Sequence, residues 1–207
     1  MDGEDLKLVK NIMEKVKKSG DPDTVLFDTP TTQIAKTNFF ILKGLLELEG
    51  KKGYFVSLDR PHQNMSYLLQ NHDISQENIW YIDAVSHMSG SKRIGKKNVE
   101  ENVDFVDNTF QIEEFVEFFK EKGVKRKNFG SLEDIDFILI DNVFPILNYN
   151  NIEKIQEFLS SFEELIASHE NLFGLIVMNS NSHDNLDRII KRHVKTVIDV
   201  KKLKEDA

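Results

Sequence analysis

The chain has 207 residues, of which 40% are hydrophobic and 30% charged, and its formal net charge at pH 7 is −8. This length predicts one domain with one sizeable core. The negative charge argues against binding nucleic acid or an anionic membrane through bulk electrostatic attraction. The chain contains no cysteine, which excludes disulfides and thiolate chemistry. The N-terminus lacks the layout of a signal peptide, and no apolar run reaches the roughly 20 residues of a membrane helix. We therefore expect a cytoplasmic protein with no membrane partner.

Apolar periodicity predicts a helix over residues 5–19, because its apolar residues recur at spacings of three and four. Gly20 suits the C-terminal cap of this helix. We expect residues 1–20 to form an N-terminal helix that packs on the core. Residues 21–203 would then form a single α/β domain, and residues 204–207 a frayed tail.

Short apolar runs and helical spacings alternate along the rest of the chain. The runs predict strands at residues 24–27, 54–58, 79–82, 136–141, 172–178 and 194–200. The spacings predict helices that end near residue 49 and that cover residues 61–71, 109–122, 152–169 and 185–192. This alternation predicts a doubly wound α/β fold whose mostly parallel sheet of at least five strands is flanked by helices. The strands at 136–141 and 172–178 should be fully buried, because their apolar runs are unbroken.

The pattern weakens between residues 85 and 108. Residues 89–98 carry two glycines and several basic side chains with no apolar periodicity, so we predict that they form the most mobile internal loop. Residues 120–127 form a second basic patch. Given the acidic total charge, we interpret both patches as solvated loop surface.

Residues 24–37, TVLFDTPTTQIAKT, have the order strand, tight loop, Lys-Thr and helix. This is the order of a nucleotide-binding P-loop, in which Gly, four residues and Gly-Lys-Ser/Thr follow a strand. Lys36 and Thr37 hold the last two places of that motif, while Pro30 and Ala35 stand where the glycines should be. In a parallel α/β sheet the ligand site lies beyond the carboxyl ends of the strands. The polar residues expected there are 28–37, 59–60, 83, 141–142 and 179–183.

The order of these pieces resembles the RecA-like ATPase superfamily, and most closely its KaiC/RadA-type branch, which is common in archaea. The resemblance covers about residues 24–203. Residues 24–61 are similar to the branch's Walker A strand, loop, helix and second strand, and NHDISQENIWYIDAVS to its third strand. DFILIDNV resembles the Walker B strand, and LFGLIVMNSNS the next strand and sensor loop. No single motif is specific, and the order and spacing carry the resemblance.

The resemblance implies a RecA-like P-loop NTPase fold and a site for ATP and Mg²⁺. The nucleotide-binding candidates are Thr31, Thr32, Lys36, Thr37, Asp141 and Asn179. Thr37 and Asp141 would hold Mg²⁺ if ATP binds, and Asp59 would orient the attacking water as a catalytic residue. If the resemblance holds, we expect Asp141 to lie within side-chain reach of Lys36 or Thr37.

Pro30 and Ala35, which replace the two glycines of the P-loop motif, predict a backbone conformation different from that of a phosphate-binding loop. Pro30 lacks an N–H and fixes φ, and Ala35 places a methyl group where the backbone should approach phosphate. Thr29 suits a helix N-cap and Pro30 the first helical position. We therefore predict that the helix begins between Pro30 and Gln33 and fills the space of a phosphate cradle. The Thr31 and Thr32 hydroxyls could then attract an anion only weakly.

Three functions are compatible with this sequence. The first, which the missing glycines favour, is a degenerate RecA/KaiC-like domain with weak or no ATP hydrolysis that acts as a regulatory or partner-binding module. Such a module would bind a protein partner or self-associate, with no cofactor if the P-loop is lost. The second is an active non-standard ATPase that binds Mg·ATP through Lys36, Thr37 and Asp141. The third, a nucleic-acid-binding accessory protein, is disfavoured by the net charge.

The six histidines show no metal-ligand spacing.

Overall fold

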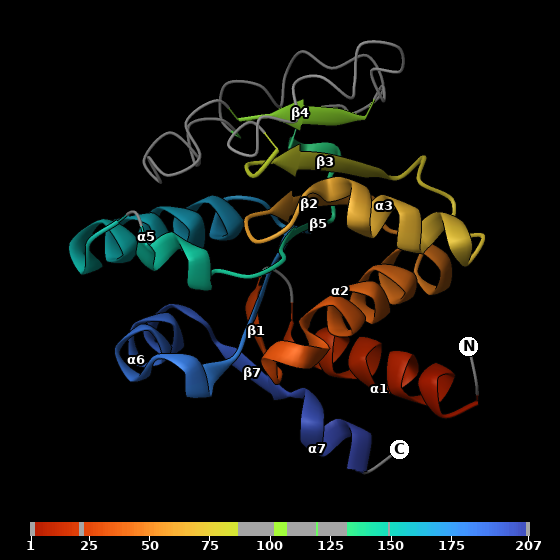
Figure 1. Cartoon of the computed structure of the whole chain (residues 1–207), viewed down its shortest axis with the longest axis horizontal. Helices are drawn as coiled ribbons and strands as arrows, with labels where there is room; N and C mark the ends of the chain where they lie inside the picture. The colour runs from red at the N-terminus through yellow and green to blue at the C-terminus, as the bar shows by residue number, and fades with distance from the viewer. Residues whose placement is uncertain are drawn as a thin grey trace.

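A seven-stranded parallel sheet runs through the molecule in the order β4-β3-β2-β5-β6-β1-β7 (Figure 1). The computed structural model describes residues 3–20, 23–86, 102–106, 119, 132–148 and 150–205. The strands are β1 (Asp23–Asp28), β2 (Gly53–Ser57), β3 (Ile79–Asp83), β4 (Val103–Phe105), β5 (Phe137–Ile140), β6 (Phe173–Met178) and β7 (Thr196–Asp199). The prediction of a doubly wound, mostly parallel sheet is confirmed.

Helices cover both faces of this sheet (Figure 1). They are α1 (Gly3–Ser19), α2 (Ile34–Lys43), α3 (His62–Asn71), α5 (Ile152–Ala167), α6 (Asp184–His193) and α7 (Val200–Glu205). Helices α1, α2, α3 and α7 enclose one hydrophobic core with the sheet, and α5 and α6 enclose the other. A sheet covered in this way has apolar residues on both faces of each strand.

The central strands divide their side chains between the two cores. Phe137 and Leu139 of β5 face α2, whereas Ile138 and Ile140 face α5. Every residue of β5 and β6 is buried, as predicted for the two strands, but Asp136, which the prediction included, precedes β5 and is only partly buried. The period of two in a strand thus lets one unbroken apolar run serve both cores.

Helical structure begins at Thr31, within the range that the sequence predicts, although the α-helix α2 itself begins at Ile34. A 3₁₀ turn at Thr31–Gln33 leads directly into α2, and a π-helical segment at Gly44–Leu48 continues it. The capping detail is different from the prediction. Pro30, in an extended conformation, occupies the N-cap position and no side chain caps the turn, because the Thr29 hydroxyl pairs with Thr37 instead. Pro61 likewise precedes α3 at its N-cap rather than opening it.

The chain ends differ from the expected pattern as well. The predicted last strand, 194–200, is shortened to β7, and Val200 opens α7, so Lys204 and Glu205 are helical rather than frayed. Apolar contacts explain this, because Val200 and Leu203 are buried in the core beside α1. Strand β4 was not predicted. The residues predicted to form a mobile loop (89–98) and a second basic patch (120–127), and most of those predicted to form a helix (109–122), lie outside the described residues.

Candidate functional site

The sheet has a topological switch point between β2 and β5. These neighbours pair in parallel, but the chain leaves β2 through α3 toward β3 and leaves β5 through α5 toward β6. Helices α3 and α5 lie on opposite faces of the sheet. In open α/β sheets, a crevice that binds ligands opens beyond the carboxyl ends of two such strands. The residues that follow β2 and β5, among them Asp59 and Asp141, therefore lie where a ligand site is expected.

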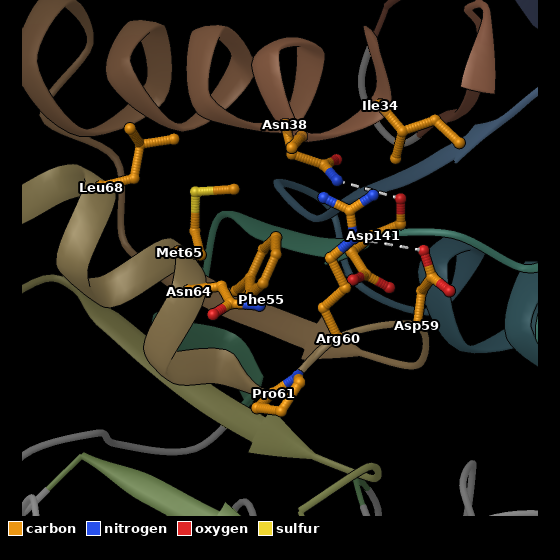
Figure 2. Close-up of a pocket in the computed structure, with 11 residues that line it drawn as sticks. Ile34, Asn38, Phe55, Asp59, Arg60, Pro61, Asn64, Met65, Leu68 and Asp141 are labelled. Carbon is orange, nitrogen blue, oxygen red and sulfur yellow. Dashed lines mark hydrogen bonds and ion pairs between the residues drawn. The ribbon is translucent and has the colours of Figure 1, made fainter. Parts of the chain in front are cut away.

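A small cavity of about 50 Å³ lies at this switch point (Figure 2). Asp59, Arg60 and Pro61 enter it from the loop after β2, and Asp141 enters it from the end of β5. The Arg60 Nε lies 3.7 Å from an Asp59 carboxylate oxygen. The structure therefore brings together the predicted catalytic residue Asp59 and the predicted magnesium ligand Asp141.

Asp141 is buried and accepts a hydrogen bond of 2.9 Å from the backbone N–H of Leu58. Burial, together with the nearby charge of Asp59, raises the pKa of its carboxyl to about 8, against the opposing effect of backbone hydrogen bonds from Leu58, Asn142 and Asp59. The carboxyl therefore keeps its proton at neutral pH. A cation bound at this carboxyl would lower its pKa again, so Asp141 stays a candidate ligand for Mg²⁺.

Asn38 is the residue of α2 that contacts Asp141. Its side-chain amide donates to the Asp141 backbone carbonyl at 3.0 Å (Figure 2). Its carbonyl oxygen, also buried, has no hydrogen-bond partner among the described residues. The cavity beside it has room for a water molecule, which could satisfy that oxygen. Helix α2 thus meets Asp141 at the predicted edge of the sheet, but through Asn38.

Lys36 and Thr37 line a different cavity, on the side of α2 that faces α1 and α7. The Lys36 ammonium pairs with the Asp5 carboxylate of α1 at 2.9 Å. The Thr37 hydroxyl lies 2.9 Å from the Thr29 hydroxyl, and both are buried. Ile34, Ala35 and Asn38 face the switch-point cavity from the same helix. The predicted site is therefore divided between two sides of α2.

The remaining candidates lie between β1 and β6. The Asn179 side-chain amide donates to the Thr31 hydroxyl at 2.8 Å, and Ser180 N–H donates to the Asp28 carboxylate at 2.9 Å. Thr31 and Thr32 are both exposed. The loop after β6 is thus attached to the loop after β1, and two predicted nucleotide-binding residues are in direct contact.

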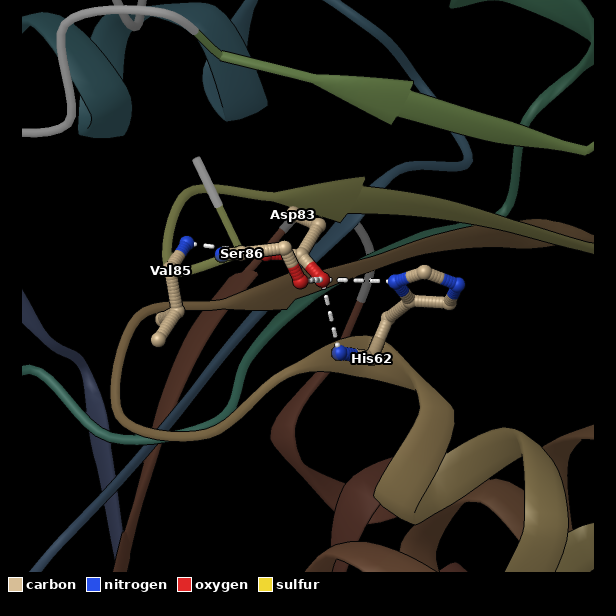
Figure 3. A network of polar contacts seen from close by, with 4 residues as sticks. All are labelled: His62, Asp83, Val85 and Ser86. Carbon is tan, nitrogen blue, oxygen red and sulfur yellow. Dashed lines mark hydrogen bonds and ion pairs between the residues drawn. The ribbon is translucent and has the colours of Figure 1, made fainter. Parts of the chain in front are cut away.

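Asp83, at the end of β3, is fully buried within a hydrogen-bond network (Figure 3). Its carboxylate accepts from His62 Nδ1 at 2.6 Å, from the His62 N–H at 2.9 Å and from the Ser86 N–H at 2.7 Å. Burial opposes its charge, but the hydrogen bonds from His62 and Ser86 outweigh burial and lower the pKa of Asp83 below its ordinary value. The network fixes the start of α3 against the end of β3, and so positions the loop that carries Asp59 and Arg60.

Sequence reasoning missed Asn38, although a signal was present. It lies four residues after Ile34 and three before Ile41, within the apolar stripe of α2. A polar residue in such a stripe is buried and needs a hydrogen-bond partner. Asp5 and the lysines of α7 gave no such signal, because their contacts depend on how the terminal helices pack.

The part of the chain that the structure describes contains no cluster of three or more His, Cys, Asp or Glu side chains that could hold a metal ion. Nor does any helix in that part have the length and apolar character needed to cross a membrane.

The chain matches no protein-family model and no curated protein, but solved structures do resemble it. It superposes on a KaiC-like protein from the hyperthermophilic archaeon Pyrococcus horikoshii OT3 with a TM-score of 0.54 and 18% sequence identity, over 86% of this chain and 72% of that one. The chain has a RecA-like fold of the KaiC type. A second solved structure, an ATPase domain, aligns at a TM-score of 0.49 and 11% identity over 95% of this chain and 83% of that one. At these identities the likeness concerns the fold alone.

Proposed function

We propose that this protein is a RecA/KaiC-like domain that does not hydrolyse ATP efficiently and acts as a regulatory or protein-binding module. The observation that carries the proposal is the start of α2. Helical structure begins at Thr31, directly after Pro30, where a P-loop would hold an open turn around phosphate.

The backbone donors of this segment support the proposal. The Thr29 N–H donates to the Met178 carbonyl at 2.9 Å, and the Gln33 N–H donates to the Pro30 carbonyl at 2.7 Å. The Ile34 N–H donates to the Thr31 carbonyl, and Pro30 has no N–H to offer. A phosphate cradle needs several backbone N–H groups that point at one anion, so this segment does not fit the triphosphate of ATP.

The side chains support the proposal in the same way. The Lys36 ammonium pairs with Asp5, and the Thr37 hydroxyl pairs with Thr29. Asp59 and Asp141 line the other side of α2. Holding Mg·ATP between these groups would require α2 to turn and its first turn to open. Residues that resemble an ATP site in sequence therefore do not fit Mg·ATP in this arrangement.

Several large apolar side chains remain available for a protein partner. Tyr67 of α3 is 65% exposed, and Val197 of the edge strand β7 is 46% exposed. An edge strand also offers unpaired backbone groups to another chain. These features suit a module that acts through protein contacts.

Calorimetric titration of the full chain with Mg·ATP tests this function, together with an assay of phosphate release. We expect no saturable binding at sub-millimolar ATP, and any residual phosphate release should be unchanged in Lys36→Ala. Lys43→Ala is the matched control, because Lys43 lies on the same helix and pairs with Glu47 instead. Magnesium-dependent ATP binding that is lost in Lys36→Ala and retained in Lys43→Ala, with both variants folded, would establish the active ATPase instead.

A further inference from the structure

The cavity that Lys36 faces is the larger of the two described above. It lies between α1, the first turns of α2 and α7, and its volume is about 430 Å³. Pockets for small organic ligands begin at about 300 Å³ and are mostly apolar, with a few polar groups that orient the ligand. This cavity, which we call the α7 cavity, has that size. Its apolar wall consists of Leu8 of α1, Phe40 of α2 and Val200 of α7, all three buried.

The rim of the α7 cavity is positively charged in a protein of net charge −8. Lys36, Lys201 and Lys204 line it, and Glu205 is the one acidic side chain among the described residues that line it. Within the described part of the chain, Lys201 and Lys204 have no ion-pair partner, whereas Lys202 between them pairs with Asp199 at 3.6 Å. Local positive charge attracts anions even to an acidic protein.

The contacts of Lys36 indicate which anion suits the cavity. Its ammonium lies 2.9 Å from a carboxylate oxygen of Asp5 and 5.1 Å from the centre of the Phe40 ring. The side chain is 46% exposed, so a second carboxylate can reach the same ammonium from the cavity. A carboxylate that binds here would place its apolar body against Phe40.

The hydroxyl pair of Thr29 and Thr37 adds a buried donor. Both residues line the cavity, and their oxygens lie 2.9 Å apart with one hydroxyl donating to the other. Each hydroxyl carries one hydrogen, so the hydrogen of the accepting hydroxyl remains free. Among the described residues neither hydroxyl has a further hydrogen-bond partner. An anionic oxygen in the cavity would accept that hydrogen.

We propose that the α7 cavity binds a small organic carboxylate, whose apolar body packs on Leu8, Phe40 and Val200 and whose carboxylate is held by the lysines and the threonine hydroxyls. The apolar wall disfavours an inorganic anion, and the three lysines disfavour a cation or a neutral ligand. This site goes beyond the proposed function, because it requires neither Mg²⁺ nor ATP and includes neither Asp59 nor Asp141.

Titration calorimetry of the full chain with octanoate, in buffer without magnesium or nucleotide, tests the proposal. We expect saturable binding in the millimolar range or tighter. Octanol, which has the same chain and no charge, should bind at least about tenfold more weakly, as should inorganic phosphate.

A pair of double variants isolates the role of the rim. Lys201→Glu with Lys204→Glu reverses the charge of the cavity and should weaken octanoate binding by about tenfold or more. The control is Lys191→Glu with Lys202→Glu, which changes the net charge of the protein by the same amount. These two residues lie on α6 and α7, and neither lines the cavity. This control should change the affinity by less than about twofold. All four lysines are exposed, so both variants should fold.

Three results would overturn the proposal: no saturable octanoate binding up to about 10 mM, equal weakening in both double variants, or equal affinity for octanol or phosphate. The outcome is separable from that of the ATP titration. If neither octanoate nor ATP binds, the carboxylate site is refuted and the proposed function still stands. Magnesium-dependent ATP binding that requires Lys36 would contradict the proposed function, whether or not octanoate binds.

Discussion

Asp141 is the residue of the switch-point cavity whose side-chain pKa is shifted away from its ordinary value. Its carboxyl is buried and accepts a backbone hydrogen bond from Leu58. Burial raises the pKa of this carboxyl from an ordinary value of 3.8 to about 8. Because a shifted pKa links protonation to folding, this single residue should give the free energy of unfolding a measurable dependence on pH.

We expect the free energy of unfolding to fall as pH rises from about 4 to about 8. In this range the unfolded chain has lost the Asp141 proton while the folded chain keeps it, so rising pH favours the unfolded state. The favourable contribution is complete below pH 4 and is lost as pH passes the folded pKa. Asp141→Asn, whose side-chain carbonyl can still accept from Leu58 N–H, should flatten this slope. Urea unfolding at several pH values measures it.

Asp136→Asn is the control for this measurement. Asp136 directly precedes β5, at the opposite end from Asp141, and pairs with Lys51 at 2.7 Å. Its replacement should leave the Asp141-dependent slope between pH 4 and 8 in place. An unchanged slope in Asp141→Asn would show that Asp141 ionises normally in the folded protein.

At the scale of secondary structure, the start of α2 decides what the site can do. Helical structure from Thr31 onward places Asn38 on the side of Asp141, and Lys36 and Thr37 on the side of α7. Residues three and four apart share a face of a helix. Asn38 therefore lies on the same face as Ile34, and Phe40 lies on the same face as Lys36 and Thr37. The division of the predicted site is therefore a consequence of helical geometry.

Replacement of Ala35 by glycine tests this helix start. Ala35 lies in the first turn of α2, where glycine should lower the free energy of unfolding by about 0.5–1 kcal/mol, because glycine loses more backbone entropy in a helix. In an open P-loop the same change would restore the consensus residue and be neutral or favourable. Urea unfolding of Ala35→Gly against the natural protein, with circular dichroism to confirm the fold, distinguishes these results. A stability equal to or above that of the natural protein would argue against the helical start.

At the scale of the whole molecule, the switch point exists because β2 and β5 lie side by side. Gly53 pairs with Phe137 at the start of this pairing. A Cβ atom on Gly53 would lie 2.2 Å from the Phe137 carbonyl oxygen and 2.5 Å from its ring. Since the nearest atom belongs to the backbone, a side chain at this position must displace one strand from the other.

Gly53→Ala should therefore lower the free energy of unfolding by about 1–3 kcal/mol or more, as overpacking of a closely packed core does. Gly3→Ala is the control, because a Cβ atom there would meet no atom of the other described residues within 4 Å. Chemical denaturation of both variants gives the comparison. Equal stability of Gly53→Ala and the natural protein would contradict this register of β2 and β5.

The buried strands of the sheet and the helical start near Thr31 could be predicted from the order of the amino acids alone. Apolar runs such as FILI in β5 and FGLIVM in β6 predict buried strands, because only a fold that covers both faces of a strand removes such runs from water. Pro30 predicts a helix start near Thr31, because its fixed φ and missing N–H act within a few residues. The switch-point residues Asp59 and Asp141 could also be predicted, since they directly follow strands.

The tertiary structure alone decided which of these residues meet. Asn38 contacts Asp141, 103 positions away in the chain, and Lys36 contacts Asp5 rather than a ligand-facing carboxylate. Helix α7 replaced the expected end of the last strand because Val200 and Leu203 find a core beside α1. Local propensity and periodicity fix how a segment is coiled or extended, but the neighbours of each side chain depend on strand order and on the rotation of a helix against the sheet. These are set by the packing of segments that are distant in the sequence.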